Sequence, residues 1–258
     1  MESKLKKPIK YWEMSKTQDN IGEISIYGEI VSEKWFDEEI SATSFKDDLD
    51  DLGDVKTINL HINSPGGSVF EGIAIHNMLK MHKAKINVYV DGLAASIASV
   101  IAMSGDTIFM PENSMLMIHN PWTVAMGNSK ELRKQADDLD RIAQASVKTY
   151  LSKSNGKIDE ETLVKLLDEE TWLSAQEAVD YGLADEVLES NKAVASLPGE
   201  FLERYKHVPN QLIKQSAPGN SINRERLIVK AKEKIDYVNN TLGGVTLWQL
   251  HFMKRNKI

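Results

Sequence analysis

Apolar and polar residues alternate in several short stretches of the first 190 positions, with the two-residue period of a β-strand. Residues 57–63 are the clearest case, because Ile58, Leu60 and Ile62 would share one face. The same alternation, or a short apolar run between turn residues, predicts further strands at residues 23–31, 86–90, 107–110, 115–118 and 184–188.

Between these stretches, apolar residues recur every three or four positions, which is the period of an amphipathic helix. The longest such segment is residues 128–154, with Leu132, Leu139 and Val147 on its apolar stripe. Shorter helices are predicted at residues 42–52, 69–82, 93–103, 159–167 and 175–181. Strands that alternate with helices in this way predict an α/β fold with parallel strand pairing.

The chain divides into three segments by pattern and charge. Residues 1–20 read as a polar N-terminal arm, residues 21–190 as the main domain and residues 191–258 as a basic C-terminal extension with a helix near 222–240. The net charge is −14 over residues 1–200 and +7 over residues 201–258. An acidic bulk argues against nucleic acid as the main ligand, and the basic extension is either a solvated helix face or a contact for an acidic partner.

The chain contains no cysteine, so disulfides, thiolate metal sites and a cysteine nucleophile are excluded. No apolar run reaches the roughly 18 residues of a membrane span, and no apolar segment follows the early lysines as in a secretory signal. We therefore expect a cytoplasmic protein with no membrane partner, no metal and no cofactor.

Three short segments carry candidate chemistry. Ser96 follows Asp91-Gly92-Leu93-Ala94-Ala95 at a strand-to-helix junction, where free backbone N–H groups favour a developing negative charge. Asn63-Ser64-Pro65-Gly66-Gly67-Ser68 is a turn after a strand and could cradle an oxyanion. His119 ends an apolar strand before Asn120-Pro121-Trp122. Taken singly, Ser96 could be an ordinary packing serine, the glycine segment a tight turn and His119 a structural histidine.

The combination of these segments, in this order and at this spacing, resembles the ClpP family of self-compartmentalising serine proteases. Gly67 precedes Ser96 by 29 positions and Ser96 precedes His119 by 23. The likeness extends over about residues 23–190 and includes the closing segment Trp172–Asp185. It implies a ClpP/crotonase-type spiral of β-β-α units with a long handle helix, plus a small C-terminal extension.

The resemblance also implies roles for individual residues. Ser96 would be the nucleophile, His119 the general acid/base, and the backbone N–H groups of Gly67 and Ile97 the oxyanion donors. The family usually has Asp shortly before Leu-Ser-Ala, where this chain has Glu170, with Asp168 as the alternative acid. Substrate would add as a β-strand between Ser68-Val69-Phe70 and Asn120-Pro121-Trp122.

Several features are similar to the ClpP-like proteases of tailed phages and prophages. These are the pair Tyr11-Trp12, the segment Glu170-Thr171-Trp172-Leu173 and the C-terminal extension. This likeness implies a serine endopeptidase that processes capsid or scaffold precursors during prohead maturation, in the bacterial cytoplasm or within the prohead. The long helix implies a ring-shaped homo-oligomer, either a heptamer or a double heptamer.

Three alternatives remain at this point. The first is general Clp-type proteolysis with an ATPase partner. The second is a crotonase-like enzyme acting on an acyl-CoA, although the Ser96 and His119 pair favours the peptidase. The third is an inactive ring-forming assembly protein, which the substitution at Glu170 leaves open.

Overall fold

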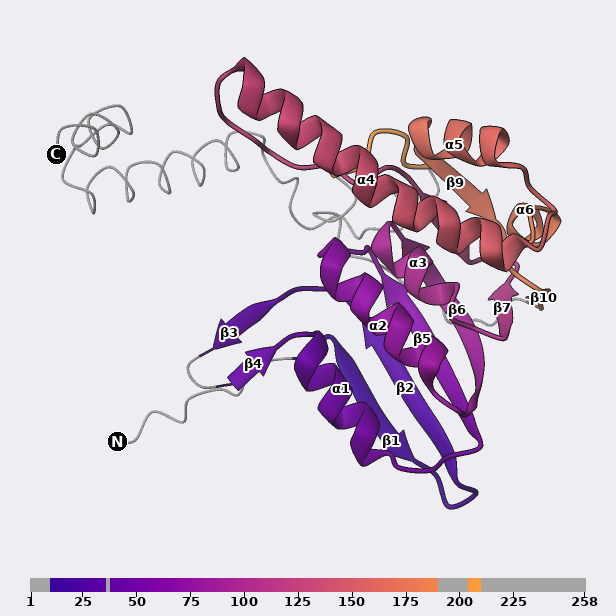
Figure 1. Cartoon of the computed structure of the whole chain (residues 1–258). Coiled ribbons are helices and arrows are strands. Elements are labelled where there is room, and N and C mark those ends of the chain that lie inside the picture. Colours follow the sequence, from indigo (N-terminus) through magenta and orange to yellow (C-terminus); the bar gives the residue numbers. More distant parts are fainter. Residues whose placement is uncertain (1–9, 36–37, 190–203, 210–258) are drawn as a thin grey trace, which may run out of the picture. The chain divides into compact units, whose positions relative to one another are not determined.

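The computed structural model describes residues 10–35, 38–189 and 204–209 (Figure 1). For residues 33–35 and 38–40 it describes the backbone alone. By internal contacts the chain divides into one unit of residues 1–216 and a second of residues 217–258, and this second unit lies outside the described residues.

An eight-stranded sheet forms the framework of the first unit. Its main path runs β1-β2-β5-β6-β7-β10, and β8 pairs with both β6 and β9. The pairs along β2, β5, β6, β7 and β10 are parallel, whereas β1 lies antiparallel to β2 and β9 antiparallel to β8. The strands are β1 (Trp12–Lys16), β2 (Ile21–Tyr27), β5 (Thr57–Ser64), β6 (Lys85–Ala95), β7 (Thr107–Pro111), β8 (Met115–Ile118), β9 (Thr171–Ser174) and β10 (Glu186–Leu188), and a separate two-stranded sheet consists of β3 (Glu33–Trp35) and β4 (Glu38–Ile40).

The helices cover the apolar side of this sheet, where α1, α2 and α3 lie along the strands (Figure 1). Strand β5 shows why: its residues alternate between half-buried and buried, and Ile58, Leu60 and Ile62 are fully buried in the main core. The helices are α1 (Ala42–Asp51), α2 (Val69–Met81), α3 (Ile97–Ala102), α4 (Ser129–Ser154), α5 (Glu160–Asp168) and α6 (Ala175–Asp180).

Helix α4 begins at a capping box in which the side chain of Asn128 accepts from the backbone N–H of Glu131 and the Glu131 carboxylate accepts in return. Only the C-terminal part of this 26-residue helix is buried, through Ser146, Val147, Tyr150 and Ser154. The apolar stripe nearer its start is exposed, and Leu132 is 44% exposed.

The parallel α/β architecture predicted from the sequence is confirmed, but some elements differ. Leu93 and Ala95 were expected in a helix, yet both belong to β6 because they pair with Met115 and Met117 of β8. Strands β1, β3, β4 and β9 were not predicted, and β1 lies within the segment expected as a polar arm. The expected boundary near residue 190 and the helix at 222–240 fall outside the described residues.

Candidate active site

Ser96 occupies the single residue between β6 and α3, with its backbone at φ 55° and ψ −129°. A positive φ is uncommon for a non-glycine residue and marks a sharp turn held by its surroundings. The Ser96 N–H donates to the carbonyl of Met117 at 2.9 Å, which ties the turn to β8. The strand-to-helix turn therefore projects the Ser96 side chain at the carboxyl ends of β6 and β8.

His119 follows the last residue of β8 and faces Ser96. Its Nε2 lies 2.8 Å from Ser96 Oγ, within hydrogen-bonding distance. The imidazole is nearly buried, with 9% of the side chain exposed. Burial lowers the pKa of His119 below its ordinary value, and the charge of Glu170 acts in the opposite direction. Burial therefore favours the neutral, proton-accepting form of this histidine.

Glu170 lies on the other side of the imidazole, in the turn between α5 and β9. Its Oε2 is 3.9 Å from His119 Nδ1, its side chain is 11% exposed, and its backbone has a positive φ of 53°. Asp168, the alternative acid, instead accepts a hydrogen bond from Asn120 Nδ2 at 2.6 Å. The structure thus brings Glu170 rather than Asp168 to the imidazole.

The turn after β5 packs directly against Ser96. Gly67 pairs with Ile30 in a parallel bridge that uses the carbonyl of Gly66 and the N–H of Ser68. In this pattern the N–H of Gly67 points away from Ile30. A Cβ on Gly67 would lie 2.0 Å from the carbonyl oxygen of Ile30, so no side chain fits there. The second expected donor is the N–H of Ile97 in the first turn of α3, where helical N–H groups lack intrahelical partners.

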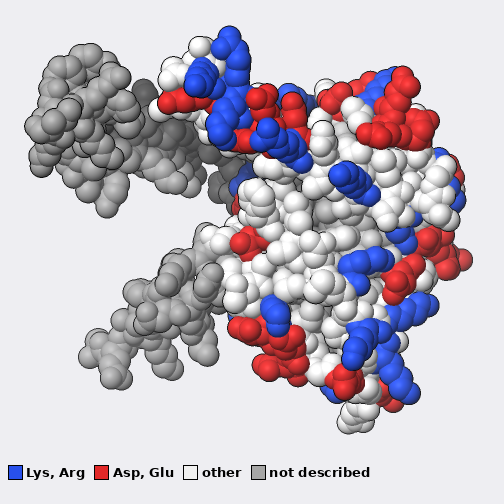
Figure 2. Space-filling model, viewed as in Figure 1, with Lys and Arg blue, Asp and Glu red and all other residues white. Residues whose placement is uncertain are grey.

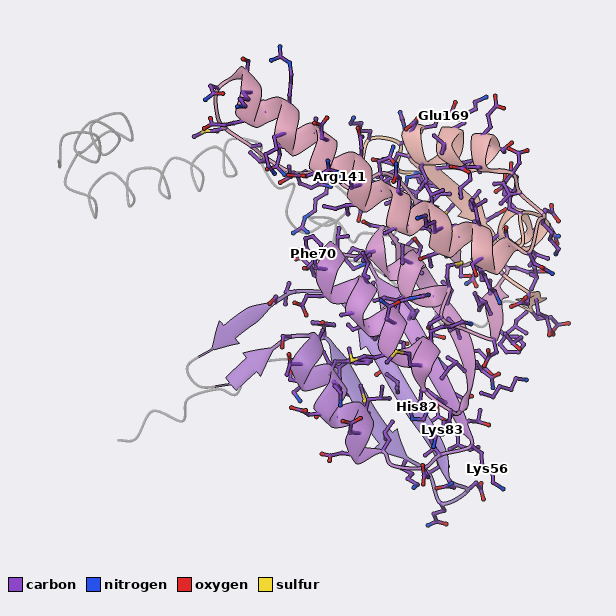
Figure 3. The ribbon with its side chains drawn as sticks, viewed as in Figure 1. Lys56, Phe70, His82, Lys83, Arg141 and Glu169 are labelled. Atoms are coloured by element: carbon purple, nitrogen blue, oxygen red, sulfur yellow. The ribbon has the colours of Figure 1, made fainter. Side chains whose placement is uncertain are left out.

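The expected substrate-binding residues lie on both sides of Ser96, but not all are extended. Ser68 is extended, at φ −66° and ψ 118°, whereas Val69 and Phe70 form the first turn of α2. A helical backbone cannot pair with a substrate strand, so these two can contribute side chains only. Phe70, labelled at the end of α2 in Figure 3, is 69% exposed, and Trp122 beyond His119 is 60% exposed.

A short segment that the sequence did not predict, residues 204–207, contacts this site. The backbone N–H groups of Lys206 and His207 both donate to Glu170 Oε1, at 2.5 and 3.0 Å. The ring of Tyr205 stands edge-on to His119 with 5.6 Å between ring centroids. Arg204 to His207 show no period and no motif, so the tyrosine in a polar, proline-punctuated stretch is the only signal the sequence offers.

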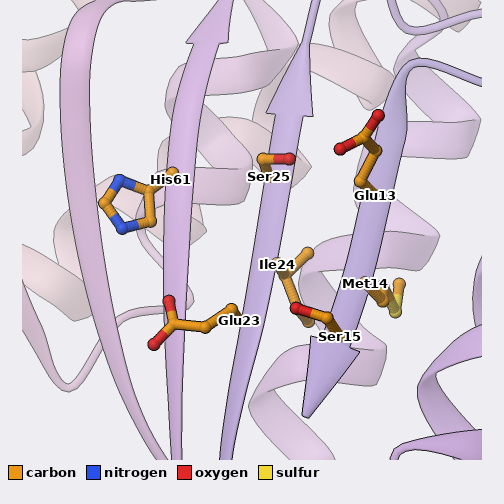
Figure 4. Close-up of a pocket in the computed structure, with 7 residues that line it drawn as sticks. All are labelled: Glu13, Met14, Ser15, Glu23, Ile24, Ser25 and His61. Atoms are coloured by element: carbon orange, nitrogen blue, oxygen red, sulfur yellow. The ribbon is translucent and has the colours of Figure 1, made fainter. Parts of the chain in front are cut away.

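A second histidine–carboxylate pair lies on the sheet at some remove from Ser96. His61 Nδ1 is 2.9 Å from Asp91 Oδ2, which also accepts from the Tyr27 hydroxyl at 2.5 Å. His61 borders a shallow cavity of about 170 Å³ on β1, β2 and β5 (Figure 4). Its lining residues are Glu13, Met14, Ser15, Glu23, Ile24, Ser25 and His61. No hydroxyl among the described residues is hydrogen-bonded to His61, so this pair does not repeat the arrangement at His119.

The described residues contain no group of three or more His, Asp or Glu side chains placed to hold a metal ion. Within the same ranges, no helix combines the length and hydropathy needed to cross a bilayer. On the face drawn in Figure 2, acidic and basic side chains are interspersed along α4. That face offers no concentrated basic surface of the kind that phosphate backbones require.

Comparison with known proteins finds similarity to Clp proteases. A family model described as Clp protease matches residues 21–191. The ATP-dependent Clp protease proteolytic subunit of Ligilactobacillus salivarius (strain UCC118) is 36% identical over 148 residues, 57% of this chain and 74% of that protein. Proteolytic subunit 1 of Protochlamydia amoebophila (strain UWE25) is 34% identical over 145 residues, 55% of this chain and 69% of the relative. Among solved structures, a ClpP1 mutant from Listeria monocytogenes has a TM-score of 0.55 at 29% identity, covering 64% of this chain and 90% of that one.

Proposed function

The chain belongs to the Clp protease family and is a serine peptidase, and from this premise we propose that Ser96, His119 and Glu170 are its catalytic triad. The observation that carries the assignment is the 2.8 Å contact between Ser96 Oγ and His119 Nε2, with Glu170 on the far side of the ring. Nucleophile, base and acid then stand in the order that acyl transfer requires.

On this proposal, peptide hydrolysis proceeds in the following steps. Ser96 Oγ attacks the scissile carbonyl carbon while His119 Nε2 takes the hydroxyl proton. The negative charge that develops on the carbonyl oxygen is received by the N–H groups of Gly67 and Ile97. His119 then gives its proton to the leaving amine. In the second half of the reaction, water gives a proton to His119 and attacks the acyl carbon, and Ser96 Oγ leaves and takes that proton back.

Glu170 has two effects on His119. The proton on Nδ1 faces the carboxylate, which fixes the tautomer that leaves Nε2 free to accept from Ser96. Its charge also stabilises the imidazolium that forms during each proton transfer. The 3.9 Å separation exceeds a hydrogen bond, and such contacts often tighten only when substrate is bound.

The test is reaction with a fluorophosphonate, followed by intact mass and peptide mapping. Wild-type protein should gain one label on Ser96, and Ser96→Ala should gain none. A crotonase-like enzyme would instead bind an acyl-CoA and keep that activity in Ser96→Ala. Failure of folded wild-type protein to react would favour the inactive assembly protein and refute the triad.

A narrower proposal is that the substrates are capsid or scaffold precursors of a tailed phage. What supports it is the likeness of the Tyr11-Trp12 pair, the Glu170–Leu173 segment and the C-terminal extension to those proteases. Tyr11 and Trp12 are buried at the start of β1, and Trp12 Nε1 donates to Asp48 at 2.7 Å, so the pair is an integral part of this fold. In this setting the enzyme works in the host cytoplasm or inside the prohead.

Co-expression tests this choice of substrate. The protein, as wild type or Ser96→Ala, is produced with a candidate capsid precursor, and both are read by intact mass. Shortening of the precursor only with the wild type would support prohead processing. Cleavage of unfolded proteins only when a Clp-type ATPase is added, with precursor left intact, would favour general Clp proteolysis.

We also propose a ring-shaped homo-oligomer assembled partly through α4. Val124 and Met126, just before this helix, are each 85% exposed, and Leu132 in its first turns is 44% exposed. Large apolar side chains exposed at nearby positions of the chain are expected on a surface that another subunit covers. Light scattering of the protein and of Leu132→Lys would test it, since the variant should give smaller particles.

A further inference from the structure

Residues 204–207 form a segment that contacts the proposed catalytic residues and is here called the strap. It lies beyond residues 21–191, the region that the Clp protease model matches. Its four residues make contacts at three places around the site. Arg204 forms a bidentate ion pair with Glu29, Tyr205 donates its hydroxyl proton to the carbonyl of Pro65, and the next two amides donate to Glu170.

The two carboxylate oxygens of Glu170 have different partners. Oε1 accepts the N–H groups of Lys206 and His207, and Oε2 faces His119 Nδ1. A carboxylate held by two backbone donors cannot rotate freely, so its second oxygen stays directed at the imidazole. The His207 ring adds a contact of 2.9 Å between its Nδ1 and the carbonyl oxygen of Glu169.

Tyr205 packs with its ring against the ring of His119. Its ring stands edge-on to both His119 and Trp172, with 5.6 Å between centroids in each case. Its hydroxyl reaches Pro65, which begins the turn containing Gly66 and Gly67. The Tyr205 side chain therefore contacts His119, Trp172 and the turn that carries the expected oxyanion donor Gly67.

We propose that the strap positions the catalytic centre: Lys206 and His207 fix the Glu170 carboxylate, and Tyr205 confines the His119 ring. The inference rests on the triad proposed above. The residues of the strap are positioning residues, because none of them touches a reacting atom. A glutamate where the family usually has aspartate is then matched by a segment of the extension that holds the longer side chain in place.

The alternative for such a segment is a plug that blocks substrate. The contacts favour positioning, because the strap bonds to the back of Glu170 and to a carbonyl, and it leaves Ser96 Oγ paired with His119. A plug would be expected to occupy the nucleophile or its oxyanion donors. The two cases predict opposite changes in the reactivity of Ser96.

The experiment compares full-length proteins by the second-order rate of fluorophosphonate labelling at Ser96. Lys206→Pro removes the N–H donor, whereas Lys206→Ala keeps it and serves as the matched control. We expect Lys206→Pro to react about 10- to 100-fold more slowly than Lys206→Ala, the size of loss that follows displacement of a catalytic group by about 1 Å. Thermal melts of both variants confirm that each is folded at the assay temperature.

A pH profile provides a readout that loss of general stability would not move. Tyr205→Ala exposes the His119 ring to water, so the acid limb of the labelling rate should move to higher pH; Tyr205→Phe keeps the ring and should keep the wild-type limb. The groups around His119 are Ser96, Glu170 and Tyr205. Among the ionisable side chains of the strap, Arg204 pairs with Glu29 and His207 Nδ1 contacts the carbonyl of Glu169.

The outcomes separate the two proposals. Equal labelling rates and unchanged limbs in all strap variants would overturn the positioning role while leaving the triad intact. Faster labelling of Lys206→Pro or Tyr205→Ala would identify the strap as a plug and also overturn it. Absence of labelling in the wild type, as in Ser96→Ala, would overturn the triad, and the strap's role with it.

Discussion

The hydroxyl of Tyr150 lies 2.7 Å from that of Ser99, and this buried contact connects α4 to the catalytic turn. Ser99 has a single hydroxyl proton, which it donates to the carbonyl of Ser96 at 2.5 Å. Tyr150 must therefore be the donor to Ser99. A chain of two hydrogen bonds thus runs from the long helix to the backbone of Ser96.

Losses of unfolding free energy from removing the two hydroxyls should not be additive. Ser99→Ala leaves the buried Tyr150 hydroxyl without a partner, and we expect a loss of about 2–3 kcal/mol in the free energy of unfolding. Tyr150→Phe should cost about 1 kcal/mol. The double variant should lose less than the sum, as measured by urea unfolding. Additive losses would show that the two hydroxyls are not coupled.

Gly67 should tolerate no side chain. In Gly67→Ala the new Cβ would meet the Ile30 carbonyl at 2.0 Å, which must displace the turn that carries the expected oxyanion donor. Gly28→Ala is the matched control, because Gly28 also has positive φ but has nothing within 4 Å of a Cβ. We expect peptidase activity to fall by about 100-fold or more in Gly67→Ala. Gly28→Ala should show only the backbone strain of about 1–3 kcal/mol in thermal unfolding.

Activity should persist to lower pH than an ordinary histidine would permit. The free enzyme needs neutral His119, so the rate is complete above the pKa of this group and is lost as pH falls through it. Burial lowers that pKa below 6.5, which places the acid limb of kcat/KM below pH 6.5. The measurement is a pH–rate profile, with circular dichroism at each pH to confirm the fold. A limb above 6.5 would contradict the assignment.

Glu170→Gln should separate the charge of the acid from its size. The amide oxygen can still accept from the strap, but the charge that stabilises the imidazolium is absent, so kcat should fall by about 10²- to 10⁴-fold. Because Glu170 raises the pKa of His119, its neutralisation should also move the acid limb further down in pH. Unchanged kcat in this variant would exclude Glu170 from the triad.

The sequence could propose Ser96 and His119, with Glu170 or Asp168 as the acid, because these residues lie in short segments whose order and spacing resemble those of a known family. Glu170 rather than Asp168 could not be chosen in advance, since the choice depends on a positive φ at Glu170 and on the contact between Asp168 and Asn120. The strap was not predictable either. Its bonds to Glu170 are made by backbone N–H groups, which any sequence possesses.

The strands were predicted where burial imposes a period and missed where pairing alone determines them. Ala94 and Ala95 suggest a helix by their composition, but parallel pairing with Leu116 and Met117 keeps them in β6. Strand β1 is mostly exposed and contains Glu13 and Lys16, so its sequence has little apolar alternation. Tertiary pairing overrides local preference in both cases.

The strap is synthesised after the residues that it contacts. Lys206 bonds to Glu170 across 36 positions of sequence. A ribosome therefore delivers Ser96, His119 and Glu170 of a growing chain before it delivers the segment that bonds to Glu170. On the proposal that the strap positions Glu170, a nascent chain that ends before residue 206 lacks both backbone donors to this carboxylate and would hold it less firmly than the finished protein.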